Sequence, residues 1–81
     1  MKERIYQKLT IALGPAILEI IDVSESHRGH QGWKEKGESH FELKISADAL
    51  KSLSRVAQHQ LIYQVLIEEM KIIHALAIRV L

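Results

Sequence analysis

Hydrophobic residues recur along the chain with two spacings, of three to four residues and of two residues, and these spacings predict its helices and strands. Residues 3–12 are predicted to form a helix, because Ile5, Leu9 and Ala12 are separated by steps of four and three. Gly14, which a proline follows, is predicted to end this helix. Glycine readily adopts the left-handed conformation of a helix C-cap, and proline cannot continue a helix.

Three segments have the composition or the alternation of β-strands. Residues 16–24 are rich in Ile, Leu and Val and are too short for a typical helix. Residues 40–45 alternate between polar and apolar side chains, which places Phe41 and Ile45 on one face. Residues 74–81 show the same alternation and are predicted to be the third strand.

Helical structure is predicted between the second and third strands. Asp48 is expected to cap a short helical turn, and Ser54 is expected to cap a helix over residues 55–71. Glu68 and Glu69 are expected to lie on a solvated face of this helix. Its apolar stripe is predicted to contain Val56, His59, Tyr63, Leu66 and Met70.

The order of these elements predicts an α+β fold of the αββαβ type. The second strand, the long helix and the third strand form a crossover unit, so these two strands should be parallel. The first two strands can be antiparallel. The expected result is a three-stranded mixed sheet with helices on one face, and 81 residues suffice for one domain, residues 1–81.

Composition and charge exclude several classes of protein. There is no cysteine, which excludes disulfide scaffolds, thiol catalysis and a self-sufficient iron–sulfur site. The formal charge of +1 and the pI of about 8.1 mean that nucleic-acid binding would depend on a local basic patch. No apolar run approaches the length of a membrane span, and no signal peptide is evident, so a soluble cytoplasmic protein is expected.

Histidine is the residue type that suggests chemistry, with five copies in the chain. His27 and His30 lie in the polar stretch 25–39, which is longer than a hairpin needs and is therefore a functional candidate. His74 opens the predicted third strand. Neutral imidazole binds zinc, iron and copper, so these three histidines could form an isolated zinc or copper site.

The remaining histidines are interpreted as structural. His40 begins a strand and His59 lies within a helical stripe, where a single histidine is more often a hydrogen-bonded structural residue than a ligand. The sequence contains no nucleophile elbow, no phosphate-binding loop and no catalytic carboxylate pair. A non-enzymatic protein is therefore expected.

Three blocks of sequence together carry a family resemblance, and their order and spacing extend over residues 3–80. The blocks are the segment 18–24, the segment Gly37-Glu38-Ser39-His40-Phe41, and the segment 54–76, which carries Ser54-Arg55-Val56 and ends with Ile73-His74-Ala75-Leu76. In their order and spacing they resemble the BolA family. The resemblance implies a fold similar to class II KH domains, which agrees with the element order predicted above.

The resemblance also implies a partner and a cofactor. BolA-like proteins pair with monothiol glutaredoxins, and the pair can share a [2Fe–2S] cluster. The glutaredoxin supplies a cysteine and a bound glutathione thiol, and the BolA side supplies a C-terminal histidine and a loop histidine or cysteine. Carried over to this chain, the C-terminal ligand is His74 and the loop ligand is His27, with His30 as a close competitor.

Under this hypothesis the protein is an adaptor in iron–sulfur cluster assembly, trafficking or iron and redox sensing. It would be a monomer alone, with no cluster of its own, and a heterodimer with glutaredoxin.

DNA binding is the alternative function, because some BolA-like proteins are transcriptional regulators. The helix segment that resembles the family's Arg-His-Arg reads Gln58-His59-Gln60 here, so two expected positive charges are missing. Each lost phosphate contact lowers the affinity for DNA. A weak nucleic-acid surface would involve Arg55, His59 and Lys51.

Overall fold

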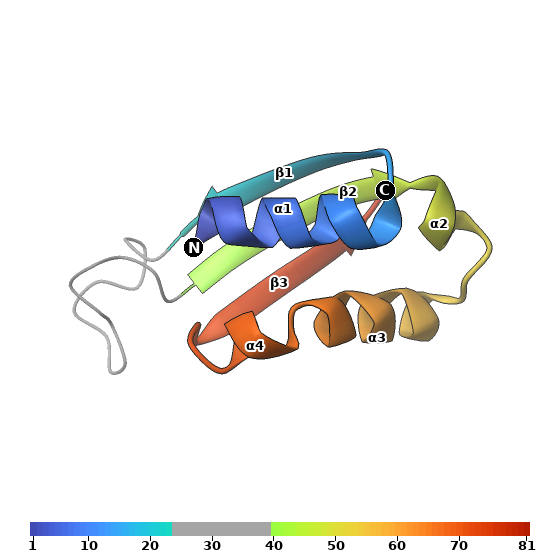
Figure 1. The fold of residues 1–81 in the computed structure, drawn as a ribbon. Coiled ribbons are helices and arrows are strands. Elements are labelled where there is room, and N and C mark those ends of the chain that lie inside the picture. Colours follow the sequence, from blue (N-terminus) through green and yellow to red (C-terminus); the bar gives the residue numbers. More distant parts are fainter. Residues whose placement is uncertain (24–39) are drawn as a thin grey trace.

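A three-stranded mixed sheet in the order β1-β2-β3 forms the centre of the fold (Figure 1). The computed structural model describes residues 1–23 and 40–81. Its elements are α1 (Lys2–Leu13), β1 (Ala16–Asp22), β2 (His40–Ala47), α2 (Asp48–Lys51), α3 (Arg55–Val65), α4 (Ile67–Met70) and β3 (Ala75–Val80). Strand β1 pairs with β2 in antiparallel register, and β2 pairs with β3 in parallel register. The predicted α+β fold and strand directions are confirmed.

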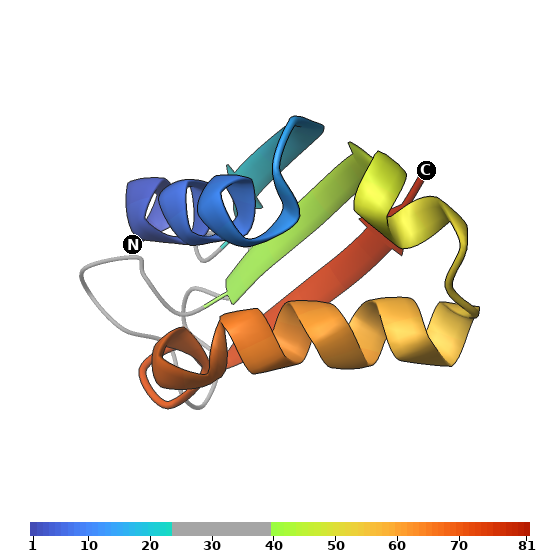
Figure 2. The ribbon, with the colours of Figure 1, turned by 45° about the vertical axis from the view of Figure 1, so that its right-hand side comes forward.

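The hydrophobic core lies between the sheet and the helices, because α1 and α3 cover the same face of the sheet (Figures 1 and 2). Alternate residues of β2 point into it, and Leu43 and Ile45 are almost completely buried. From α1 the core receives Ile5, Leu9 and Leu13. Ala12 is exposed, so its predicted place in the stripe is wrong. The third buried position of the helix is instead Leu13, which lies four residues after Leu9 and has a larger side chain than Ala12.

The turn after α1 requires glycine. Gly14 has φ 73° and ψ −154°, a region that essentially only glycine occupies. Its N–H donates to the carbonyl oxygen of Thr10 at 3.0 Å, which ends the helix as predicted.

The predicted single helix over residues 55–71 is wrong, because the chain forms two helices with a change of direction at Leu66. Leu66 has φ −99° and ψ 20°, outside the helical range. The hydrogen bonds continue through the bend, since its N–H donates to Ile62 at 3.1 Å and its carbonyl accepts from Met70 at 2.9 Å. The bend gives α4 a new direction while the N–H and carbonyl of Leu66 both stay hydrogen-bonded.

The buried stripe of these helices also differs from the predicted one. It consists of Ile62, Leu66 and Glu69. Val56 is 66% exposed, and Tyr63 is 39% exposed with its hydroxyl directed to the carbonyl of Leu76 at 3.4 Å. Val56 and Tyr63 precede the bend, so within α3 the buried face is turned away from the predicted one, whereas Leu66 of the predicted stripe is buried and Met70 packs partly buried against the core.

The two predicted N-caps have different outcomes. Ser54 caps α3 as predicted, since its Oγ accepts a hydrogen bond from the N–H of Ala57 at 3.2 Å. Asp48 is the first residue of α2 and not its cap, so that prediction is wrong. Its carboxylate instead pairs with Lys51 at 3.1 Å.

In the part of the chain that the structure describes, no helix has the length and apolar character that crossing a membrane requires.

Candidate functional site

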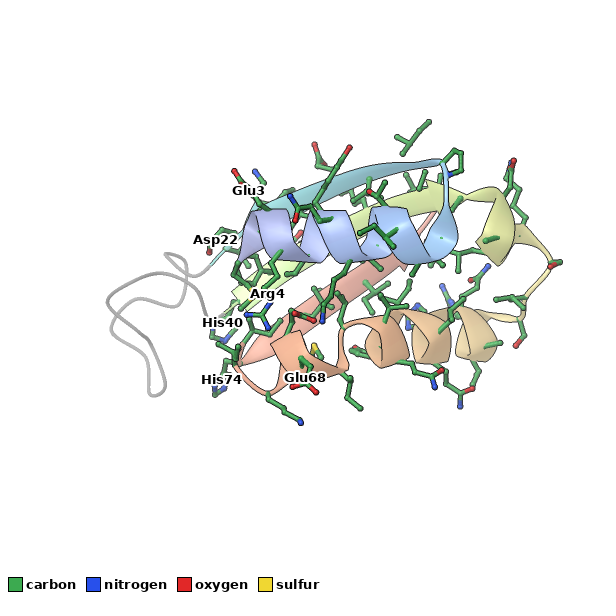
Figure 3. All side chains as sticks on the ribbon, viewed as in Figure 1. Glu3, Arg4, Asp22, His40, Glu68 and His74 are labelled. Atoms are coloured by element: carbon green, nitrogen blue, oxygen red, sulfur yellow. The ribbon has the colours of Figure 1, made fainter. Side chains whose placement is uncertain are left out.

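The strand directions bring the candidate residues to one end of the sheet. The end of β1 and the starts of β2 and β3 lie together there, because β1 is antiparallel and β3 is parallel to β2. Asp22, His40 and His74 all lie at this end, as does the first turn of α1 (Figure 3). This end of the sheet is the candidate site.

His74 is exposed and stands directly before β3. Backbone hydrogen bonds hold the turn that leads to it, since the N–H groups of Ile72 and Ile73 both donate to the carbonyl of Glu69, at 2.9 and 3.0 Å. The side chain of Ile73 is buried in the core. The predicted ligand is therefore an accessible imidazole on a backbone that is fixed on both sides.

His40 is a half-buried neighbour of His74. The two ring centroids are 4.9 Å apart, and the rings are tilted by 38°. The sequence interpretation considered His40 alone and missed this proximity. The parallel pairing of β2 and β3 was predicted, but its register, in which His40 lies opposite Ala75, was not.

The other two predicted ligands, His27 and His30, lie in residues 24–39, outside the described residues, so their assignment stays a prediction. The chain leaves the described part after Val23 and re-enters it at His40. These two residues are adjacent, since the N–H of Val23 donates to the carbonyl of His40 at 3.0 Å.

The described residues at this end of the sheet supply only part of a set of metal ligands. Within residues 1–23 and 40–81, no group of three or more His, Cys, Asp or Glu side chains could hold a metal ion. Two neighbouring imidazoles, His40 and His74, are present. A metal bound here would therefore need ligands from another molecule, from solvent or from residues 24–39.

Arg55 and His59, the predicted nucleic-acid residues, are brought together elsewhere. They line a hollow of about 300 Å³ with Arg79, at the side of α3 that faces β3. Among the described residues, neither arginine forms an ion pair. Lys51 does not line this hollow, and its ammonium group is paired with Asp48. The hollow therefore brings together two of the three predicted residues, Arg55 and His59, adds Arg79 and leaves out Lys51.

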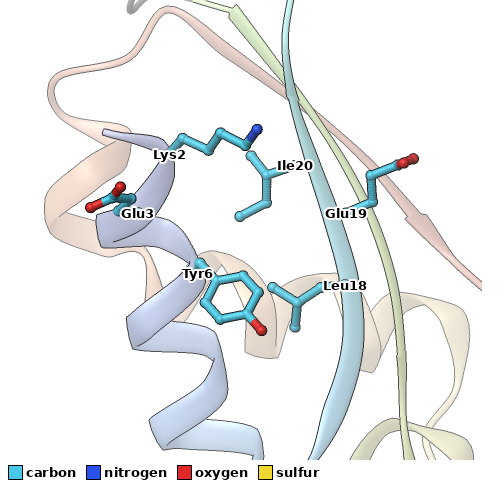
Figure 4. A pocket seen from close by; sticks show the side chains of 6 residues that line it. All are labelled: Lys2, Glu3, Tyr6, Leu18, Glu19 and Ile20. Atoms are coloured by element: carbon cyan, nitrogen blue, oxygen red, sulfur yellow. The ribbon is translucent and has the colours of Figure 1, made fainter.

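A larger hollow of about 390 Å³ lies between α1 and β1 (Figure 4). Tyr6, Leu18 and Ile20 lie between the helix and the strand, and Glu19 points away on the other side of the strand. None of the three histidines that the structure describes lines it. The hollow is therefore a partly open edge of the hydrophobic core.

Glu69 is a buried carboxylate that the sequence interpretation placed on a solvated face, and that prediction is wrong. Its side chain has 0% exposure. It accepts hydrogen bonds from the Nε of Arg4 at 2.6 Å and the Nζ of Lys8 at 3.0 Å, both on α1. Glu69 therefore ties α1 to the turn that positions His74, which we call the Glu69 clamp (Glu69, Arg4 and Lys8).

The clamp keeps the Glu69 carboxylate ionised. Burial would raise the pKa of this carboxyl group, but hydrogen bonds from Lys8, a backbone N–H and Arg4 outweigh that effect. The pKa therefore lies below its ordinary value of 4.5. No sequence pattern marked this residue, because its cationic partners are 61 and 65 positions away.

Known proteins share this sequence and this fold. Residues 9–81 match the family described as BolA-like protein. The SufE-like protein 1, chloroplastic/mitochondrial, of Arabidopsis thaliana is 44% identical over 80 residues, which are 93% of this chain and 22% of that protein. The DNA-binding transcriptional regulator BolA of Escherichia coli (strain K12) is 35% identical over 79 residues, covering 96% of this chain and 71% of the regulator. The solved structure of BolA1 from Arabidopsis thaliana has a TM-score of 0.85 and 37% identity, covering 99% of this chain and 88% of that one.

The Glu69 clamp predicts a stability effect with a defined pH range. Replacing Glu69 with Gln removes two charge-assisted hydrogen bonds, so the free energy of unfolding at pH 7 should fall by about 1–3 kcal/mol. Because the pKa is lowered on folding, the carboxylate contributes its full stabilisation above pH 4.5 and loses it as the pH falls through the folded-state pKa. The gap between wild type and Glu69→Gln should therefore shrink below pH 4.5.

Urea unfolding at several pH values measures this effect, and Glu68→Gln is the matched control. Glu68 is the neighbouring glutamate, but its side chain is 57% exposed and meets only Lys71, at 3.5 Å. Its replacement should change the unfolding free energy by less than about 0.5 kcal/mol. Equal effects of the two replacements would contradict the clamp.

Proposed function

Because the chain belongs to the BolA-like protein family, we propose that it is a non-enzymatic adaptor that binds a monothiol glutaredoxin and co-ligates a [2Fe–2S] cluster. On this proposal the ligands from this chain are His74 and either His27 or His30. BolA-like proteins are regulators or adaptors rather than enzymes. The proposed role is in iron–sulfur cluster assembly, trafficking or iron and redox sensing.

The observation that carries the proposal is the placement of His74. Its imidazole is exposed at the end of the sheet where the chain leaves and re-enters the described part, beside His40 and Val23. An exposed ligand on a rigid strand end is accessible to a partner protein. The incomplete donor set among the described residues supports a shared group, to which glutaredoxin and its bound glutathione would add two thiolates.

Histidine ligation also suits this role chemically. When bound, a cluster held partly by imidazole has a higher reduction potential than one held by four thiolates. His74 has no thiolate beside it, since the chain contains no cysteine. The chain would thus hold its side of the cluster through neutral ligands, which favours transfer or sensing over permanent storage.

The cytoplasmic location expected from the sequence stays a prediction. The Arabidopsis SufE-like relative is described as chloroplastic/mitochondrial, and this chain spans only 22% of its length. The activities of that longer protein are therefore not assigned to this chain.

Nucleic-acid binding is the second candidate function. The Escherichia coli relative is described as a DNA-binding transcriptional regulator. The hollow beside α3 supports this candidate, because Arg55 and Arg79 line it without carboxylate partners in the described part of the chain. Two arginines can neutralise about two phosphates, which predicts weak binding with a small salt dependence.

The adaptor proposal predicts a mixed-ligand cluster that depends on His74. The chain is reconstituted with a monothiol glutaredoxin, glutathione, ferrous iron and sulfide, and visible circular dichroism is compared with that of glutaredoxin alone. We expect a new spectrum that His74→Ala alters and the control His59→Ala leaves unchanged. An unchanged glutaredoxin spectrum, without co-elution on a sizing column, would remove the proposal.

The nucleic-acid candidate predicts a small salt slope for duplex DNA. Replacing Arg55 or Arg79 with Gln should lower the slope of log K against log salt by about 1 each, because each arginine contacts about one phosphate. Lys71→Gln is the charge-matched control, since Lys71 pairs with Glu68 and does not line the hollow. Fluorescence anisotropy measures the slope, and an absence of binding at low salt would exclude this candidate.

A further inference from the structure

The imidazoles of His40 and His74 come from different elements but are held at a defined separation. His40 is the first residue of β2, and the parallel pairing of β2 with β3 places it opposite Ala75, the residue after His74. The carbonyl of His40 also accepts a hydrogen bond from Val23 at 3.0 Å. Strand pairing on both sides therefore fixes the backbone from which the His40 ring projects.

The separation of the two rings matches that of two ligands to one metal ion. A Zn–N bond of about 2.0–2.1 Å places each ring centroid roughly 3.2 Å from the metal, and a tetrahedral angle then separates the two centroids by about 5 Å. The observed distance is 4.9 Å. Two packed rings without a metal have a similar separation, and the His40→Phe variant described below tells the two arrangements apart.

We propose that His40 and His74 form a two-imidazole site for a divalent transition-metal ion such as Zn²⁺ on the isolated chain. Residues 1–23 and 40–81 supply no third ligand, so the remaining positions are left to donors outside these residues, such as water. This site shares His74 with the proposed cluster but exists without glutaredoxin. The second ligand of that cluster is still proposed to be His27 or His30, so the zinc site does not depend on the proposed function.

Zinc binding by the isolated 81-residue chain tests the site. Zn²⁺ is titrated into ¹⁵N-labelled protein, and the ring nitrogens are followed by long-range ¹H–¹⁵N correlation while calorimetry gives the affinity. We expect the His40 and His74 ring signals to shift together at the lowest zinc concentrations. Chemical shifts that move first at His27 or His30 together with His74, but not at His40, would overturn the proposal.

His40→Phe separates ligation from packing. Phenylalanine keeps an aromatic ring against His74 but offers no nitrogen to a metal. Loss of a supporting group near a metal typically costs about 10–100-fold in affinity, so loss of a ligand should weaken zinc binding by at least about tenfold. His74→Phe should have the same effect, and His59→Phe should have none. Zinc affinity unchanged in His40→Phe would overturn the site.

The failure of this inference is distinguishable from the failure of the proposed function. Reconstitution of the unaltered chain with glutaredoxin tests the proposed function, because it does not involve free zinc. A zinc site that requires both histidines, together with no shared cluster, would support the pair and contradict the adaptor.

Discussion

Strand β2 is hydrogen-bonded to a neighbour on each side, and this double pairing determines where the other elements lie. Its antiparallel partner β1 ends, and its parallel partner β3 begins, at the end of the sheet where β2 itself begins. His40 and His74 are separated by more than thirty residues in sequence but are neighbours for this reason. The buried face of the same strand anchors the helices, so the core and the candidate site depend on one strand.

The Glu69 clamp adds a second constraint on the same end of the molecule. The carboxylate of Glu69 bonds to α1, and its backbone carbonyl accepts from the turn that precedes His74. A buried carboxylate without such partners would be strongly destabilising. Here the cationic partners are partly exposed, so the charge is neutralised at the edge of the core. One residue thereby connects the N-terminal helix to the backbone of the candidate ligand.

The sequence was sufficient for features with a local signal. Alternation at residues 40–45 identified β2 and its buried face, and Gly14 marked the end of α1. The bend at Leu66 had no such signal in the sequence. The hydrogen bonds of the helix continue through it. The burial of Glu69 depends on cations more than sixty residues away, which periodicity cannot reveal.

The candidate site was predictable only in part for a related reason. His74 followed from a family resemblance, whereas the proximity of His40 followed from strand register. A polar residue at the start of a strand carries no indication of what lies beside it in the next strand. Chemistry at the ends of strands therefore depends on three-dimensional information even where the strands themselves are evident.

On the proposed function, the end of the sheet that carries His40 and His74 faces a partner's metal group. The most direct measurement uses ¹⁵N-labelled chain titrated with cluster-loaded monothiol glutaredoxin, because a paramagnetic [2Fe–2S] cluster broadens the signals of nearby nuclei. The account predicts broadening centred on His74 and its neighbours Val23 and His40. Broadening centred on the hollow at Arg55 and Arg79, or no broadening at all, would contradict it.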